Sequence, residues 1–150
     1  MVSREARDIY RTCRKKILQY VGNRGPMDDD EISRVCTELF GNRWVGVCDA
    51  GHFKPQQGYF IVNTSYKSTS VGSHWVAIIV EGTFIYVYDS YGRTSSLILQ
   101  KLEKKLTNTK YDLIDITHAP FQRRSQVCGQ LSISWLYMAH TCGLAVATII

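Results

Sequence analysis

One cysteine, one histidine, one acidic residue and one glutamine are placed along the chain so that together they could perform thiol chemistry. Cys128 opens a stretch, 128–140, whose composition predicts a helix, and His74 and Asp89 flank an apolar segment far upstream. A thiol is a weak nucleophile until it ionises, and both a helix N-terminus and a neighbouring imidazole favour the thiolate. Gln122 stands six residues before Cys128 and carries an amide that donates hydrogen bonds. These are the residue types of a thiol-dependent acyl-transfer site.

Each of the four residues has a role in cutting a peptide bond. Cys128 attacks the carbonyl carbon, His74 takes the thiol proton and later protonates the leaving amine, and Asp89 fixes the tautomer of the imidazole. The side-chain amide of Gln122 and the backbone N–H of Cys128 bind the oxyanion. Three neighbours of these residues are candidates for substrate binding, namely Ser73, Trp75 and Gly129. Glycine at the last of these positions lets a substrate backbone approach closely.

A predicted hairpin brings His74 and Asp89 to the same place. The apolar runs 75–80 and 83–88 flank Glu81-Gly82, a two-residue turn in which glycine tolerates a positive φ. Because the strands of a hairpin run in opposite directions, the residue before the first strand and the residue after the second lie at the same open end. We therefore expect His74 and Asp89 to be close in space, although they are 15 positions apart.

The whole chain predicts an α+β fold in the order helix, helix, strand, hairpin, helix, strand, helix. A second helix over 28–40 begins with Asp28-Asp29-Asp30, which supply an N-cap and acids for its first turn. We expect further strands over 58–63 and 111–116 and a helix over 94–106. The segment 43–55 has no regular pattern, and 64–72 and 118–127 are expected to be loops.

Length and composition indicate one globular domain over residues 1–150. Of the 150 residues, 45% are hydrophobic and 21% are charged, and no apolar run approaches the roughly 20 residues that cross a bilayer. The first residues lack the apolar core of a signal peptide, so we expect an intracellular protein that has no membrane partner and is monomeric. The five cysteines are irregularly spaced, which favours reduced thiols and no bound metal.

The positive charge is concentrated in the predicted N-terminal helix, residues 1–24, ahead of a catalytic core over 27–150. This segment holds seven basic and two acidic residues, and the rest of the chain holds equal numbers of each, so the net charge of +5 belongs to it. Its apolar residues follow helical spacing. The basic side is either an ordinary solvated face or a surface for a polyanion such as DNA. The candidate contacts are Arg4, Arg7, Arg11, Arg14 and Lys15.

Four segments, taken in order, resemble the adenovirus endopeptidase family over roughly Asp28 to His140. They are Trp44-Val45-Gly46-Val47-Cys48-Asp49, then Phe60-Ile61-Val62-Asn63-Thr64 with Gly72-Ser73-His74-Trp75-Val76-Ala77, then Tyr88-Asp89-Ser90-Tyr91-Gly92, and finally Gln122 with Cys128-Gly129. The last of these is also similar to the related proteases of ubiquitin-like proteins. The resemblance implies a papain-related core in which a mixed sheet packs against helices and the nucleophile begins a central helix.

The resemblance also implies a function. In that viral family the substrates are precursors of capsid and core proteins, cut after small residues at sites that contain glycine. We accordingly expect a viral maturation protease in the nucleus or cytoplasm of a host cell, packaged in the virion, with polyprotein or capsid precursors as substrates. The chemistry needs no cofactor, but the family implies stimulation by DNA and by a peptide activator. Tyr111 falls near the position of the cysteine that tethers this peptide in the family, so we do not expect the tether here.

Two alternatives stay open at this point. The same chemistry could remove ubiquitin or a ubiquitin-like modifier, which also presents a Gly-Gly carboxyl end. A catalytically silent module could instead use the basic helix to hold DNA. Within the enzyme hypothesis, the other thiols are expected to be packing residues or to lack a partner: Cys13, Cys36, Cys48 and Cys142. The other histidines do not precede a strand whose partner ends in an acid: His52, His118 and His140.

Overall fold

The computed structural model describes residues 3–22, 25–64, 74–90, 95–116 and 127–150. These segments form α1 (Arg4–Val21), α2 (Asp29–Phe40), the short 3-10 helix η1 (Gly41–Arg43), β1 (Trp44–Asp49), β2 (Gly58–Asn63), β3 (Trp75–Glu81), β4 (Phe84–Tyr88), α3 (Ser95–Leu106), β5 (Asp112–Asp115), α4 (Cys128–Cys142) and α5 (Leu144–Ala147). Among the described helices, none is both long enough and apolar enough to span a bilayer.

The five strands form one mixed sheet in the order β1-β2-β3-β4-β5. The inner pairs β2–β3 and β3–β4 are antiparallel, and the outer pairs β1–β2 and β4–β5 are parallel. As a result β1, β2, β4 and β5 all end at the edge of the sheet where β3 begins. Residues at the ends of β1, β2, β4 and β5 and at the start of β3 therefore lie at the same end of the sheet.

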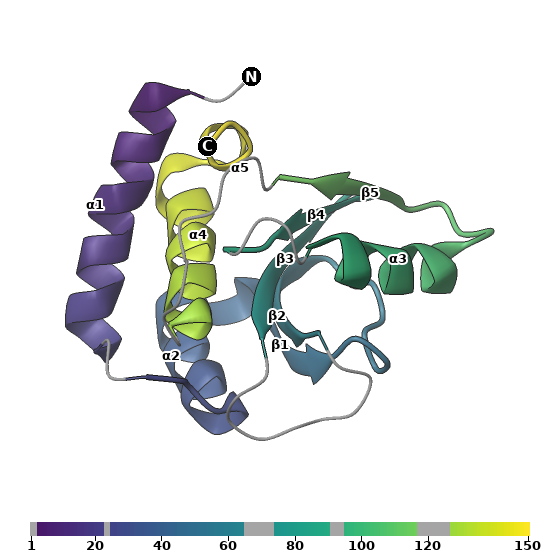
Figure 1. Cartoon of the computed structure of the whole chain (residues 1–150), viewed down its shortest axis with the longest axis horizontal. Helices are drawn as coiled ribbons and strands as arrows, with labels where there is room; N and C mark the ends of the chain where they lie inside the picture. Colours follow the sequence, from purple (N-terminus) through teal and green to yellow (C-terminus); the bar gives the residue numbers. More distant parts are fainter. Residues whose placement is uncertain (1–2, 23–24, 65–73, 91–94, 117–126) are drawn as a thin grey trace.

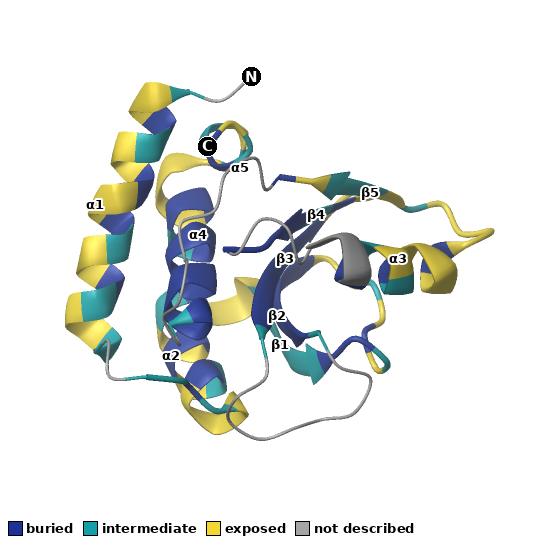
Figure 2. Ribbon diagram, viewed as in Figure 1, coloured by how far each residue is buried: buried dark blue, intermediate teal, exposed yellow. Residues whose placement is uncertain are grey.

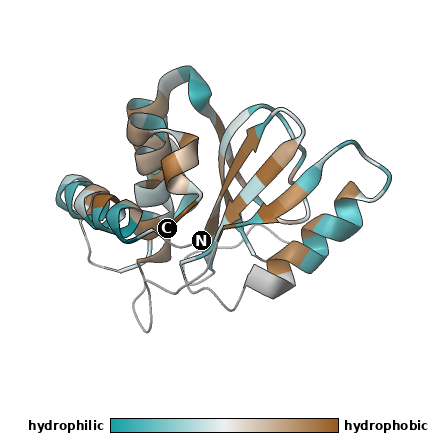
Figure 3. Ribbon diagram, turned by 90° about the horizontal axis from the view of Figure 1, so that it is seen from above, coloured by the Kyte–Doolittle hydropathy of each residue, from teal (hydrophilic) through white to brown (hydrophobic). Residues whose placement is uncertain are grey.

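Helices cover both faces of this sheet. Figure 1 shows α1, α2, α4 and α5 on one side and α3 on the other, and the view from above in Figure 3 shows the same separation. Alternate residues of β2 and β3 pack on opposite faces of the sheet. In β2, Tyr59 and Ile61 pack toward α4, whereas Phe60 and Val62 pack toward α3. Because both faces are covered, these strands are continuous apolar runs and do not alternate with polar residues.

Helix α4 is the central helix of the larger layer. Eleven of its fifteen residues are buried, around nearly the whole circumference (Figure 2). A helix that is buried on nearly all sides is typical of a core position between other elements. Helix α1 lies against it through Ala6, Tyr10, Cys13 and Ile17, while the outer side of α1 is exposed (Figure 2). The nucleophile candidate thus begins a helix held by α1 on one side and the sheet on the other.

The starts of the first two helices follow from their capping residues. The Ser3 hydroxyl accepts a hydrogen bond from the N–H of Ala6 at 3.1 Å. Asp28 and Glu31 form a capping box, in which each side chain accepts from the backbone N–H of the other residue. The prediction that the aspartates at 28–30 begin a helix is confirmed, because Asp28 is the N-cap and Asp29 and Asp30 lie in the first turn.

One predicted segment was wrong, because residues 44–49 form a strand and not an irregular stretch. β1 is an edge strand that pairs in parallel with β2, and its register shifts between Trp44 and Gly46. A parallel partner is not set by a local turn, and the bulge breaks the alternation by which a strand is recognised. Strand β2 was predicted with its bounds as found, and the hairpin turn lies one residue later than expected, at Gly82-Thr83. Gly82 has φ +61°, the conformation for which glycine was expected.

Candidate active site

The hairpin β3–β4 places a histidine beside a carboxylate at the open end of the sheet. His74 immediately precedes β3 and Asp89 immediately follows β4. The distance between His74 Nε2 and Asp89 Oδ1 is 2.6 Å, as the predicted topology required. The Asp89 side chain is fully buried and that of His74 is 14% exposed. Because a carboxylate can only accept a hydrogen bond, Nε2 of the His74 ring carries the proton in this contact. That leaves Nδ1 for contacts with groups other than Asp89.

Aromatic packing fixes the strand end that carries Asp89. The ring of Tyr88 stacks on Trp135 of α4 at a centroid distance of 5.4 Å and an interplanar angle of 9°. Its hydroxyl donates to the Tyr10 hydroxyl at 3.0 Å, and Tyr10 in turn donates to the carbonyl of Leu131 at 3.2 Å. The residue next to Asp89 is therefore tied to both α1 and α4. The buried carboxylate is placed by this packing and not by a loop.

Cys128 is the first residue of α4, and its sulfur contacts the start of β3. The backbone N–H of Trp75 donates to Cys128 Sγ at 3.4 Å, and the Ser132 hydroxyl donates to the Trp75 carbonyl at 3.2 Å. The hydrogen-bond ladder of α4 begins at Leu131, so the N–H groups of its first turn precede the ladder and point out of the helix end. An amide donor and the positive end of the helix dipole both favour a negative sulfur.

The pKa of His74 reflects three competing influences. Burial lowers the pKa of the imidazole, but the hydrogen bond to Asp89 and the neighbouring Cys128 together outweigh burial. The net result is a pKa raised from 6.5 to about 9. The ring is consequently protonated at neutral pH. Cys128 also raises this pKa, and its sulfur contacts the N–H of Trp75, the residue after His74, so sulfur, imidazole and carboxylate lie at one site.

Two of the proposed substrate-binding residues are packed against Met27. The indole N–H of Trp75, a residue only 3% exposed, donates to the Met27 carbonyl at 3.0 Å. A Cβ at Gly129 would lie 3.3 Å from Met27 Cβ and 3.4 Å from its sulfur. The close approach that Gly129 permits here is therefore that of Met27. Met27 was not singled out in the sequence, because a lone methionine after a proline carries no pattern.

The other thiols are placed differently from Cys128. Burial raises the pKa of the Cys36 thiol, and burial followed by the Asp49 charge raises the pKa of Cys48 to about 11. Burial likewise raises the pKa of Cys13, with Cys142 adding to the effect. Cys142 is exposed at the far end of α4 from Cys128. No histidine contributes to the pKa of Cys36 or of Cys48.

Some predicted residues lie outside the part of the chain that the structure describes. These are Gln122, the proposed oxyanion donor, and Ser73. The five basic residues of the proposed nucleic-acid surface all lie on α1: Arg4, Arg11 and Lys15 are exposed, and Arg7 and Arg14 are half-buried. Arg11 pairs with Asp8 at 2.8 Å, and a shallow hollow is lined by Arg11, Arg14, Lys15, Leu18 and Gln19. Cys128 and His74 belong to other elements, so the basic face of α1 is not part of the candidate active site.

A lysine on α3 supports the segment that holds His74. The Lys101 ammonium donates to the Thr64 carbonyl at 2.7 Å, and the Thr64 N–H donates to the His74 carbonyl at 3.0 Å. Thr64 thus links α3 to the backbone of the histidine. No sequence signal predicted this role, because Lys101 stands among other lysines on an amphipathic helix.

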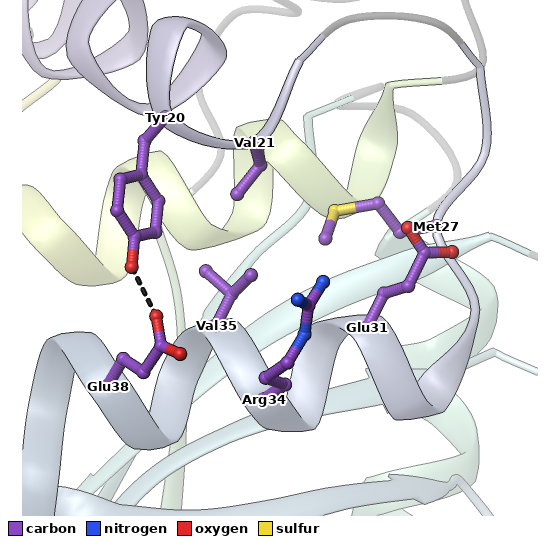
Figure 4. A pocket seen from close by; sticks show the side chains of 7 residues that line it. All are labelled: Tyr20, Val21, Met27, Glu31, Arg34, Val35 and Glu38. Atoms are coloured by element: carbon purple, nitrogen blue, oxygen red, sulfur yellow. Dashed lines mark hydrogen bonds between the residues drawn. The ribbon is translucent and has the colours of Figure 1, made fainter.

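A separate hollow lies between the end of α1 and α2 (Figure 4). Figure 4 shows the Tyr20 hydroxyl bound to the Glu38 carboxylate across it, with Met27 at the other end. The lining residues are Tyr20, Val21, Met27, Glu31, Arg34, Val35 and Glu38. This hollow reaches the site only indirectly, through the contacts of Met27 with Trp75 and Gly129.

The sequence matches no protein-family model and no curated protein. Among solved structures, the chain is similar to one described as AvrA delL154 with IP6 and CoA, with a TM-score of 0.45 and 13% sequence identity. The alignment covers 87% of this chain and 57% of that chain, so this chain spans less than two thirds of the neighbour's length. At this level of similarity the neighbour says nothing about what this chain binds or catalyses.

Proposed function

We propose that this chain is a cysteine endopeptidase that cuts peptide bonds by acyl transfer through Cys128, His74 and Asp89. The observation that carries the proposal is the Cys128 sulfur at the start of α4, held by the N–H of Trp75, next in sequence to an imidazole that lies 2.6 Å from a fully buried carboxylate. Nucleophile, base and orienting group within mutual reach are the signature of covalent acyl transfer. Their placement on a helix start and two strand ends supports the papain-related core that the sequence resemblance implies.

The chemistry follows from the protonation states at this site. His74 is already an imidazolium at neutral pH, and in the proposed mechanism Cys128 attacks as its ion-pair partner, the thiolate, which forms a C–S bond to the substrate carbonyl carbon and an oxyanion. The imidazolium then gives its proton to the leaving amine as the C–N bond breaks, which leaves a thioester on Cys128. Water, deprotonated by His74, attacks the thioester, and the C–S bond breaks to release the acid and restore the thiol. Asp89 stabilises the imidazolium in both halves.

The oxyanion would be bound by donors at the start of α4. The backbone N–H of Cys128 belongs to the first turn, where amides point out of the helix. Gln122 supplies the second donor in this proposal, by its resemblance to the glutamine of the adenovirus endopeptidase family. An oxyanion-hole donor contributes about 100- to 1,000-fold to kcat. We expect Gln122→Ala to lose activity in that range.

Narrow access to the sulfur supports cleavage next to small residues. Cys128 is 6% exposed, its sulfur accepts from the N–H of Trp75, and the neighbouring Gly129 packs against Met27. A glycine beside the scissile bond would approach a sulfur with this little exposure more easily than a residue with a large side chain. This favours the proposed substrates, structural-protein precursors of a virus cut at sites that contain glycine.

The test is proteolysis of candidate precursors with sequencing of the new termini. We expect wild-type protein to cut capsid or core precursors after a small residue, and Cys128→Ala and His74→Ala to abolish cleavage. Release of a ubiquitin-like modifier from its conjugate, with precursors left intact, would replace this assignment with the modifier protease. Binding to DNA without any cleavage by the wild-type chain would favour the silent module.

We also propose that the outer face of α1 binds a polyanion such as DNA. The whole net charge of +5 belongs to the N-terminal segment, and the exposed side of α1 carries Arg4, Arg11 and Lys15. Lys and Arg side chains on one face of a helix attract phosphate backbones without reading their sequence.

A further inference from the structure

A second Asp–His pair lies at the end of β1. Both carboxylate oxygens of Asp49 lie close to His52 Nδ1, at 2.8 Å and 2.9 Å, and Oδ1 also accepts from the His52 backbone N–H at 2.9 Å. The Asp49 side chain is 1% exposed, whereas the His52 side chain is 78% exposed. A buried carboxylate therefore fixes the orientation of an imidazole that stands in solvent.

The turn that carries this imidazole is itself held from two sides. The Ala50 N–H donates to the carbonyl of Asn63 at the end of β2, at 2.9 Å. From α3, the Lys105 ammonium donates to the carbonyls of Ala50 and Gly51. Long or exposed side chains usually lose freedom when they bind a ligand, and a ring fixed beforehand avoids much of that cost. The ammonium group also places a positive charge next to the turn.

The pairing register places this turn close to the candidate active site. Asp49 pairs with Asn63, and Asn63 pairs with Trp75, the residue after His74. Two strand spacings separate Asp49 from Trp75, which corresponds to about 10 Å. An extended peptide covers this distance with about three residues. A peptide that runs from Cys128 along this end of the sheet toward β1 would reach His52 with its third or fourth residue from the scissile bond.

We propose that His52 is a specificity residue that binds an acidic side chain of the peptide substrate, three or four residues from the bond that is cut. The inference rests on the proposed endopeptidase function. Asp49 only accepts hydrogen bonds, so Nδ1 of His52 keeps its proton and Nε2 is the nitrogen available to a ligand. In the protonated ring Nε2 donates a hydrogen bond to the carboxylate of the substrate, and the positive charge of Lys105 attracts the same carboxylate.

A pair of substitutions separates this role from simple support of the turn. In His52→Asn the amide nitrogen takes the position of Nδ1 and keeps a donor for Asp49, but nothing replaces Nε2. In His52→Gln the amide nitrogen reaches the position of Nε2 and can still contact a substrate. The two variants therefore remove different halves of the ring, and their thermal unfolding reports whether the turn stays intact.

The experiment uses the full-length chain and peptides built on a cleaved precursor site, with Glu, Gln or Ala placed in turn at the third and fourth positions on each side of the bond. We expect the wild type to prefer Glu at one position by about 3- to 10-fold in kcat/KM, mostly through KM, as for an exposed ion pair. His52→Asn should lose this preference with kcat at saturation unchanged, and His52→Gln should keep part of it.

The preference for Glu surviving in His52→Asn, or its absence from the wild type at all four positions, would overturn the inference while leaving the endopeptidase in place. A wild-type chain that cuts none of these peptides or their precursor overturns both proposals together. Equal losses of kcat and of thermal stability in the two variants would assign His52 to the turn alone.

Discussion

Replacing Asp89 by asparagine should separate the electrostatic part of the proposed mechanism from its geometry. An asparagine side chain has nearly the same shape as the carboxylate it replaces, and Asp89 is fully buried beside Tyr88, so the packing at the end of β4 is kept. What is lost is the negative charge 2.6 Å from His74 Nε2. The asparagine amide can also donate to Nε2, which would move the ring proton to Nδ1, on the side of the thiol.

The pKa of His74 gives the size of the expected effect. A rise from 6.5 to about 9 corresponds to about 3 kcal/mol of added stabilisation of the imidazolium. Without the Asp89 charge, burial is opposed by Cys128 alone among the causes that raised this pKa, and the pKa of His74 should fall back toward its ordinary value of 6.5. At pH 8 the protonated fraction then drops about 10-fold. Loss of ring orientation should bring the total decrease in kcat/KM to about 100-fold.

The measurement is the pH profile of kcat/KM for a cleaved peptide. Because the leaving amine needs the proton of the imidazolium, the alkaline limb should lie near pH 9 in the wild type and move by about two pH units toward acid in Asp89→Asn. The raised pKa also stabilises the fold, fully below pH 6.5, and this contribution is lost as the pH rises through about 9. In urea unfolding, the free energy of unfolding of Asp89→Asn should lack this dependence on pH. An alkaline limb at the same pH in both proteins would refute the coupling of Asp89 to His74.

Three further perturbations test the support of the site and the basic helix. Lys101→Met should lower kcat/KM about 3- to 10-fold by releasing Thr64, whereas Lys104→Met on the same helix should not, and Lys101→Arg should restore most of the rate; equal rates for all three would exclude the link. Tyr10→Phe should lower the free energy of unfolding by about 1–2 kcal/mol, seen as a lower urea midpoint at constant slope, because it leaves the buried Tyr88 hydroxyl without its acceptor. Binding of a fluorescent DNA duplex, followed by anisotropy, should weaken steeply with added salt, and binding that ignores salt would remove the polyanion surface of α1.

Local patterns were enough to predict most elements and the meeting of His74 with Asp89. Both residues flank a hairpin that lies within 16 consecutive residues, 74–89, so their meeting follows from local sequence, although the turn was predicted one residue too early. The start of α2 at its capping aspartate and the bounds of β2 were equally local. Cys128 at the start of α4 was predicted from the apolar stretch that follows it.

Features that depend on distant partners were not predicted. Strand β1 was missed because its partner β2 is parallel and its bulge between Trp44 and Gly46 breaks the alternation. The roles of Met27 and Lys101 arise from carbonyl contacts across the fold, which residue type alone does not encode. The orientation of His52 depends on the end of the same missed strand, so its pairing with Asp49 was not foreseen.

The most direct test of the central claim is competition among the five thiols for a limiting amount of iodoacetamide at neutral pH, read by peptide mapping in the wild type and in His74→Ala. Exposed Cys142 serves as the internal reference, and Cys128 is only 6% exposed. We predict that Cys128 is alkylated first in the wild type and at least about 10-fold more slowly in His74→Ala, with Cys142 unchanged. Alkylation of Cys142 ahead of Cys128 in the wild type, with a Cys128 rate that does not respond to His74→Ala, would contradict the proposed nucleophile.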